Sequence, residues 1–192
     1  MVGQVVSLFT CALLLLCFVA FSVASFRHFD PATDSTGNLV IRGLTLCGTV
    51  LNAWLVWMNS PITVAYSVLG IAFGCASFSV FRAALRSAPA GKFHVAFTGS
   101  GPDELVTSGV YGRIRNPLYT SYLAYWAAWV PATGLHPLSV ACFVLFCVLY
   151  WLAVREEERF LTHQFGEQYL SFQSRTGRFL PRVGAQAGAS RS

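Results

Sequence analysis

Charged residues are scarce in this sequence. Only 11% of its 192 residues are Asp, Glu, Lys or Arg, whereas 55% are hydrophobic, and the mean hydropathy is +0.56. A soluble globule of this length would have to expose a large apolar surface to water, so the composition excludes that class. The sequence predicts an integral membrane protein of the all-α class.

Motifs for metal binding and ion transport are also missing. The six cysteines fall in apolar segments without paired spacing, and the four histidines are scattered, which predicts no metal site. No charge lies in the middle of an apolar segment and no internal repeat is visible, which disfavours transporters. The net charge of +5 is not arranged as a basic groove interleaved with aromatics, so nucleic-acid binding is not predicted.

Five apolar segments are present. The first, Val5 to Phe26, carries no charged side chain, and as a helix it would be about 33 Å long, enough to cross a bilayer. A cleaved signal peptide is the alternative, but the segment lacks a basic start and exceeds a usual signal core. The others are Leu39 to Met58, Pro61 to Phe81, Leu118 to Val130, and Pro137 to Val154. We therefore expect five membrane crossings.

The basic residues predict the orientation. With five crossings, all 13 Lys and Arg residues fall on one side of the membrane, which the positive-inside rule makes cytoplasmic. The amino terminus is then outside and the carboxyl terminus cytoplasmic. We expect a single domain over residues 1–181 and a disordered tail over 182–192. The long loop from Ser87 to Ser108, which contains His94, is interpreted as a lid.

Two polar blocks carry nearly all groups able to do chemistry, and the first comprises residues 105–119. Gly109 and Gly112 let a ligand approach the backbone closely, and Pro117 predicts a helix that begins near Asn116. The N–H groups of a helix start and the guanidinium of Arg115 suit a carboxylate or a phosphate. The alternative is that the block only anchors the span at the headgroups through Arg113, Arg115, Tyr111 and Tyr119.

The second block comprises residues 155–181 and begins beside three consecutive glutamates, Glu156 to Glu158. Hydrophobic residues recur at helical spacing, which predicts a cytoplasmic helical extension from Arg155 to Phe172. The alternative is a solvated helix with weak surface ion pairs. Because the fourth and fifth spans form a hairpin, their cytoplasmic ends must be neighbours, and the region around Arg115 should lie beside Glu157. Residues 104–119 and 155–181 should therefore enclose one pocket at the membrane surface.

The two blocks resemble a known family. The first reads Leu-Val-Thr-Ser-Gly-x-Tyr-x-x-x-Arg-x-Pro-x-Tyr, and the second reads Glu-Glu-x-x-Leu-x-x-x-Phe-Gly-x-x-Tyr with a closing Arg-x-x-Pro. These patterns are similar to those of the isoprenylcysteine carboxyl methyltransferase family, whose superfamily includes membrane phospholipid N-methyltransferases and thiol methyltransferases. The resemblance covers roughly Leu105 to Pro181. It implies S-adenosylmethionine as the methyl donor.

The resemblance also implies roles for individual residues. The cofactor is expected against nine residues: Glu104, Leu105, Val106, Tyr111, Asn116, Pro117, Leu118, Tyr119 and Glu157. The carboxylate of the cofactor would suit helix-start amides or Arg115, and its ammonium and ribose would suit Glu157 or Glu158. Its sulfonium would suit the aromatic faces of Tyr111 or Tyr119. Arg115 and Glu158 are the expected catalytic residues. Arg155 and Arg178 are the expected substrate-binding residues.

Two departures from the family pattern concern the acceptor. Asn116 stands where members commonly have His, and Asn can form hydrogen bonds but cannot titrate. Ala153 stands where the prenylcysteine branch has Arg, so Arg155 or Arg178 would have to substitute. We expect a lipophilic or prenylated acceptor that enters from the bilayer and attacks the methyl group in line. Only an amine acceptor needs a base, and Glu158 is the candidate.

Other interpretations of the same residues are kept open. The acceptor could be a phospholipid amine or a thiol instead of a prenylated cysteine. A sterol-reductase-like enzyme could bind NADPH in the same place, although the first block offers little capacity for a dinucleotide's phosphates. A non-enzymatic scaffold would use both blocks only as interface anchors among the membrane lipids.

Overall fold

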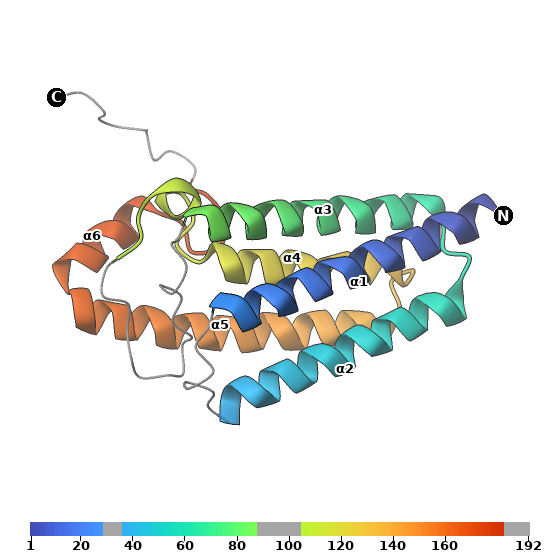
Figure 1. Ribbon diagram of the computed structural model, residues 1–192, viewed down its shortest axis with the longest axis horizontal. Helices are drawn as coiled ribbons and strands as arrows, with labels where there is room; N and C mark the ends of the chain where they lie inside the picture. The colour runs from blue at the N-terminus through green and yellow to red at the C-terminus, as the bar shows by residue number, and fades with distance from the viewer. Residues whose placement is uncertain (29–35, 88–104, 183–192) are drawn as a thin grey trace.

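The computed structural model describes residues 1–28, 36–87 and 105–182, and this part of the chain is mainly helical. The Glu104 and His94 positions, most of the predicted lid and the tail from residue 183 lie outside the described residues. Five long helices, one 3-10 turn and one short helix follow in order (Figure 1): α1 (Val2–His28), α2 (Thr36–Asn59), α3 (Val64–Ser87), η2 (Gly109–Gly112), α4 (Pro117–Ala132), α5 (Pro137–Phe165) and α6 (Glu167–Arg175).

Four of these helices, α1, α2, α3 and α5, are long and apolar enough to cross a membrane. The fourth apolar segment of the sequence forms α4, which has 16 residues and is therefore only about 24 Å long. Its aromatic side chains are buried, with Tyr125, Trp126 and Trp129 at most 2% exposed, so α4 is enclosed by its neighbours. The predicted count of five crossings stays a prediction.

Consecutive helices run in opposite directions through the bundle (Figure 1). At one end, Ile62 donates its backbone N–H to the Ser7 hydroxyl at 3.0 Å, and Gly134 lies against Ile62. At the other end, Ser87 at the close of α3 accepts a hydrogen bond from the backbone of Val110 at 3.2 Å. The two uncharged turns therefore lie together at one end, and the two polar blocks lie at the other.

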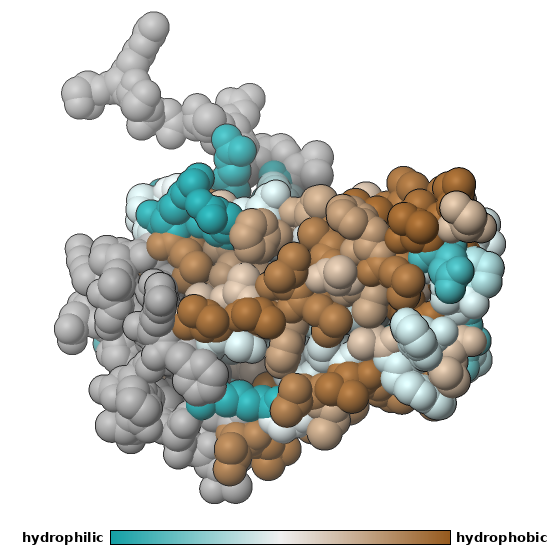
Figure 2. Space-filling view, turned by 45° about the vertical axis from the view of Figure 1, so that its right-hand side comes forward, coloured by the Kyte–Doolittle hydropathy of each residue, from teal (hydrophilic) through white to brown (hydrophobic). Residues whose placement is uncertain are grey.

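An aromatic core connects α4 with α1, α3 and α5. Trp126 and Phe146 stack with ring centroids 3.8 Å apart, and Phe21 contacts Phe81 at 4.3 Å. Outside this core the helices keep exposed apolar side chains, and Figure 2 shows hydrophobic residues covering much of the visible face of the bundle. Such a surface suits lipid rather than water, which agrees with the expected membrane setting.

The second block differs from the expected single helix. The α5 helix continues beyond the apolar span but ends at Phe165, because Gly166 adopts a positive φ of 51° that breaks the helix. The chain then reverses direction, and α6 folds back beside the end of α5 (Figure 1). The prediction of one continuous helix to Phe172 is wrong in this respect. The reversal brings residues 176–182, which we call the closing segment, against the start of α4.

Candidate functional site

The start of α4 lies where the sequence predicted it. Asn116 precedes the helix and Pro117 is its first residue. The Asn116 side chain does not cap the helix. Instead, its amide donates to Glu158 Oε1 at 3.0 Å and to the backbone oxygen of Arg178 at 3.3 Å. Asn116 is 5% exposed, so it joins the first block to both α5 and the closing segment from a buried position.

The closing segment pairs with the first block through its backbone. Arg115 N donates to Gly177 O at 2.9 Å, and Gly177 N donates to Arg113 O at 3.1 Å. A side chain at position 177 would collide with the backbone of Leu180, so only glycine fits this tight path. Thr120 donates its hydroxyl to Phe179 O at 2.8 Å. These bonds hold the two polar blocks together, as the hairpin argument predicted.

Glu158 is the centre of an ion-pair network. Its Oε1 lies 2.6 Å from Arg115 Nε, and its Oε2 lies 2.6 Å from Arg178 Nη2 and 3.0 Å from Arg178 Nε. The Glu158 side chain is only 5% exposed, compared with 12% for Arg115 and 36% for Arg178. Arg115 also donates to the backbone oxygen of Thr176 at 2.7 Å. Both oxygens of this carboxylate and both guanidinium groups are thus engaged with one another.

The neighbouring Glu157 has different surroundings. Its carboxylate is hydrogen-bonded to the Tyr119 side chain, and the residue is half-buried. It does not take part in the ion pairs of Glu158. Burial, followed by the nearby negative charge of Glu157, raises the pKa of Tyr111 above its ordinary value. Tyr111 therefore remains a neutral phenol at physiological pH. Two tyrosines from the first block and one glutamate from the second form a common cluster.

The cluster continues into the aromatic core. The Tyr119 ring lies 5.8 Å from that of Tyr150 and 6.4 Å from that of Tyr122. Burial, followed by the charge of Glu158, also raises the pKa of Tyr169 on α6, which keeps its phenol neutral. An acidic group surrounded by neutral aromatic side chains is an environment suited to a cationic ligand.

The position of Tyr111 depends on the end of α3. Tyr111 lies in η2, which begins at Gly109, where φ is +60°. A side chain at position 109 would overlap the side chain of Ser87, whose hydroxyl accepts the Val110 N–H. Glycine is required here by both backbone conformation and space.

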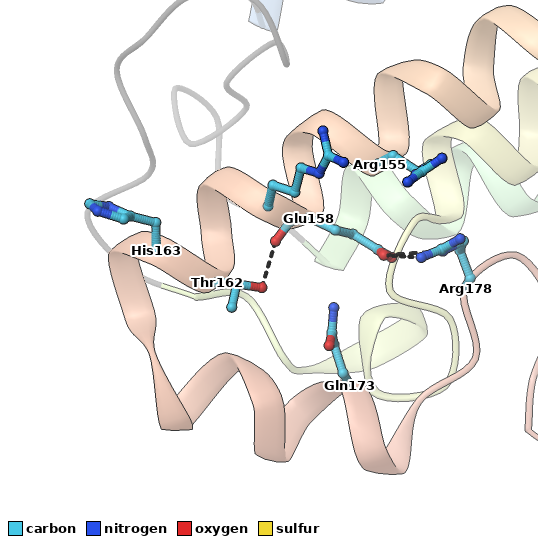
Figure 3. A pocket seen from close by; sticks show the side chains of 7 residues that line it. Arg155, Glu158, Thr162, His163, Gln173 and Arg178 are labelled. Carbon is cyan, nitrogen blue, oxygen red and sulfur yellow. Dashed lines mark hydrogen bonds and ion pairs between the residues drawn. The ribbon is translucent and has the colours of Figure 1, made fainter.

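A surface hollow of about 520 Å³ lies beside Glu158. Figure 3 shows Glu158 meeting Arg178 at one edge, with Thr162 on α5 and Gln173 on α6 nearby. The hollow contains both predicted substrate-binding arginines. Its lining residues come from α5, α6 and the closing segment: Arg155, Glu158, Arg159, Thr162, His163, Gln173 and Arg178.

The other predicted cofactor residues lie around the same region. Leu105 and Val106 are half-buried in the irregular segment that leads to η2. Pro117 is buried, and Leu118 is half-buried at the edge of the core. Tyr122, Tyr150 and several backbone groups of the closing segment were not predicted as parts of the site. Tyr122 lies one turn after Leu118, so helical spacing from the first block was the signal that could have found it.

Within residues 1–28, 36–87 and 105–182, no three His, Cys, Asp or Glu side chains cluster as metal ligands would. The fold and the site together define a membrane-embedded helical protein with a polar, aromatic-lined site at one end of its bundle. The family model described as phospholipid methyltransferase matches residues 62–168, more than half of the chain. The chain belongs to this family, which confirms the resemblance carried by the two polar blocks.

Curated relatives support the same grouping. The chain is 29% identical to human protein-S-isoprenylcysteine O-methyltransferase over 157 residues, which cover 76% of this chain and 54% of that protein. The mouse protein of the same name is 36% identical over 83 residues, covering 41% of this chain and 28% of that protein. Cobalt-zinc-cadmium resistance protein CzcN of Cupriavidus metallidurans is 31% identical over 93 residues, which cover 48% of this chain and 43% of that protein. The chain spans about half the length of these relatives or less.

Proposed function

We propose that this protein transfers a methyl group from S-adenosylmethionine to a lipophilic acceptor at the cytoplasmic surface of a membrane. The observation that carries the proposal is the cluster of Tyr111, Tyr119 and Glu157, which joins the two blocks of the family pattern. The names of the human and mouse relatives favour an isoprenylcysteine carboxylate as the acceptor class.

The residues of the cluster fit the cofactor chemically. S-adenosylmethionine supplies an electrophilic methyl group on a positively charged sulfur. The faces of Tyr111 and Tyr119 attract a cation, and Glu157 accepts hydrogen bonds from an ammonium or a ribose. Tyr111 remains a neutral phenol, and Tyr119 is hydrogen-bonded to Glu157. Both rings can therefore stabilise positive charge without competing as nucleophiles. Leu105, Val106, Pro117 and Leu118 add apolar contacts beside Asn116.

Arg115 and Glu158 act in this proposal by positioning other groups. Their ion pair, together with Arg178 and Asn116, fixes the start of α4 against α5 and the closing segment. Holding the reacting groups in one geometry can contribute on the order of 7 to 11 kcal/mol to catalysis. Glu158 has both oxygens occupied by charged donors, so it is poorly placed to take a proton. A carboxylate or thiolate acceptor requires no such base.

The anionic end of the acceptor is assigned to Arg178 and Arg155. Both line the hollow that adjoins Glu158, and Arg178 is 36% exposed although it bonds Glu158. Arg155 would replace the arginine that this chain lacks at Ala153. The lipophilic part of the acceptor would enter from the bilayer along the apolar surface of the bundle.

Cofactor binding tests the proposal directly. Purified protein in detergent is titrated with S-adenosylmethionine and, separately, with NADPH by calorimetry. Glu157→Ala and Tyr111→Ala should each weaken S-adenosylmethionine binding by about tenfold or more, because each removes a contact to the cationic ligand. The matched control is Glu156→Ala, which changes an exposed neighbour with the same charge. A preference for NADPH, or equal losses in all three variants, would contradict the proposal.

The acceptor is identified by a second experiment. The protein is incubated with a radiolabelled methyl donor and with a farnesylated cysteine, a phosphatidylethanolamine or a long-chain thiol. Base-labile label on the farnesylated cysteine is expected, because a methyl ester hydrolyses in base. Base-stable label on the phospholipid would assign the amine instead.

A further inference from the structure

The hollow beside Glu158 carries more positive charge than the proposed acceptor needs. Arg155, Arg159 and His163 follow one another at intervals of four along α5, so they form one stripe of the helix, and all three line the hollow. The acceptor was assigned only Arg155 and Arg178. The other two residues of the stripe, Arg159 and His163, therefore have no role in methyl transfer as proposed above.

Among the residues that the structure describes, the acidic groups near the stripe do not neutralise it. Glu158 is the acidic residue among the lining groups, and its carboxylate is already engaged by Arg115 and Arg178. The contact between Arg159 and Glu156 is 3.5 Å long, and the two side chains are 68% and 59% exposed, so it contributes little. Arg159, which the acceptor does not use, is therefore left to attract an anion.

The hollow opens where the apolar surface of the bundle ends. Trp151 lies one turn before Arg155 and is 43% exposed, and the guanidinium of Arg155 lies 4.6 Å above its ring. Val148 and Leu152 are also exposed on this part of α5. An exposed tryptophan between apolar and basic residues is typical of the headgroup level of a membrane.

The hydrogen-bonding groups around the hollow indicate what kind of anion fits. The Thr162 hydroxyl donates to the Glu158 backbone oxygen at 2.7 Å, so it is already used. The Gln173 amide faces the hollow from α6, across from α5 (Figure 3). The Arg159 guanidinium, the His163 imidazole and the Gln173 amide provide several donors around a single volume. A phosphate group, which has several acceptor oxygens, matches such a set of donors.

We infer that this hollow binds the phosphate of an anionic phospholipid headgroup, with the acyl chains lying along the apolar side of α5 near Trp151. Such a lipid would fix the α5 to α6 reversal against the anionic leaflet, where basic residues are attracted. Arg159 and His163 lie outside the tyrosine and Glu157 cluster and outside the arginine pair assigned to the acceptor, although they share its hollow, so the division of the hollow rests on the proposed function.

The test uses the full chain in detergent and three soluble probes. Dihexanoyl phosphatidic acid, dihexanoyl phosphatidylcholine and inorganic phosphate are each titrated by calorimetry. Saturable binding of phosphatidic acid is expected, about tenfold or more tighter than binding of the other two. Arg159→Gln and His163→Gln should each weaken it severalfold to tenfold. The control Arg175→Gln removes the same charge from α6, where the exposed Arg175 bonds Ser171 O and does not line the hollow.

Three outcomes would overturn the inference. Phosphatidic acid could fail to saturate, or Arg175→Gln could weaken its binding as much as Arg159→Gln does, which would indicate a diffuse charge effect. Equal affinity for inorganic phosphate would overturn the assignment to a lipid. Unfolding temperatures of the variants are recorded first, and because Arg159 and His163 are exposed, both variants should match the parent protein. Binding of S-adenosylmethionine is measured separately, so a failed proposed function would not be mistaken for this result.

Discussion

Glu157 and Glu158 are adjacent in sequence, yet the structure gives them separate tasks. Successive residues of a helix point about 100° apart, so one side chain faces Tyr119 while the other faces Arg115 and Arg178. A buried carboxylate requires compensating charge, and Glu158 has it from two guanidinium groups. Glu157 has a phenol instead, and in the proposed function it is the group that receives the cationic ligand.

Removal of Glu158 should damage the fold more than removal of any exposed acid. Glu158→Ala leaves Arg115, which is only 12% exposed, without its carboxylate partner, and should lower the free energy of unfolding by about 3 kcal/mol. Glu156→Ala breaks only a 3.5 Å surface contact and should change it by less than about 1 kcal/mol. Unfolding in detergent, followed by circular dichroism, measures both. Equal stabilities would contradict the assignment of Glu158 as a structural centre.

The sequence predicted part of this residue-level picture. The meeting of Arg115 with the glutamate run followed from the hairpin of adjacent helices, and the helix start at Asn116 followed from Pro117. The choice of Glu158 over Glu157 as the partner of Arg115 could not be predicted. It depends on the rotation of α5 about its own axis, which is set by long-range packing.

At the scale of elements, short segments outside the α-helices build the candidate site. η2 presents Tyr111, and the closing segment supplies backbone carbonyls to Arg115, Asn116 and Thr120. Hydrophobic periodicity predicts long helices well but carries no signal for such segments. The periodic residues on either side of Gly166 therefore predicted one helix, although the glycine itself was a stop signal.

Gly109 and Gly166 offer a matched test of the turn that carries Tyr111. Both have positive φ, 60° and 51°, but only a side chain at position 109 would meet Ser87. Gly166→Ala should cost about 1 to 3 kcal/mol from backbone strain alone, because φ 51° with ψ −126° is a sparsely populated conformation. Gly109→Ala should cost about 2 kcal/mol or more, because overlap with the Ser87 side chain adds about 1 to 3 kcal/mol to the strain of its own positive φ. The free energy of unfolding in detergent measures both variants.

The functional effect of these variants should differ in the same order. Gly109→Ala displaces η2 and should weaken S-adenosylmethionine binding, whereas Gly166→Ala acts farther from Tyr111 and should weaken it less. Replacing Ser87 by Gly in the Gly109→Ala background removes the overlapping side chain. Ser87→Gly alone measures the loss of the hydrogen bond from Val110 to Ser87. If the double variant bound no better than expected from adding the two single losses, crowding against α3 would not be the cause.

At the scale of the whole molecule, α4 decides the topology. It is shorter than a usual span. Because neighbouring helices shield it from lipid, however, its length need not equal the thickness of the bilayer core. Its first residue lies at the end of the bundle that holds Ser87 and Val110. Its last residues lead to Gly134, beside Ile62, at the opposite end. A chain with this path crosses between the two ends five times.

Topology reporters distinguish five crossings from four. Green fluorescent protein, which fluoresces only in the cytoplasm, and alkaline phosphatase, which is active only outside it, are fused in turn to each terminus and after Ser87. Five crossings place the amino terminus outside and the carboxyl terminus inside, as the basic residues near α5 and α6 require. The fusion after Ser87 serves as the internal control, because it follows three spans and should match the carboxyl terminus. If both termini reported the same side, α4 would not cross, and the two polar blocks could no longer share one cytoplasmic site.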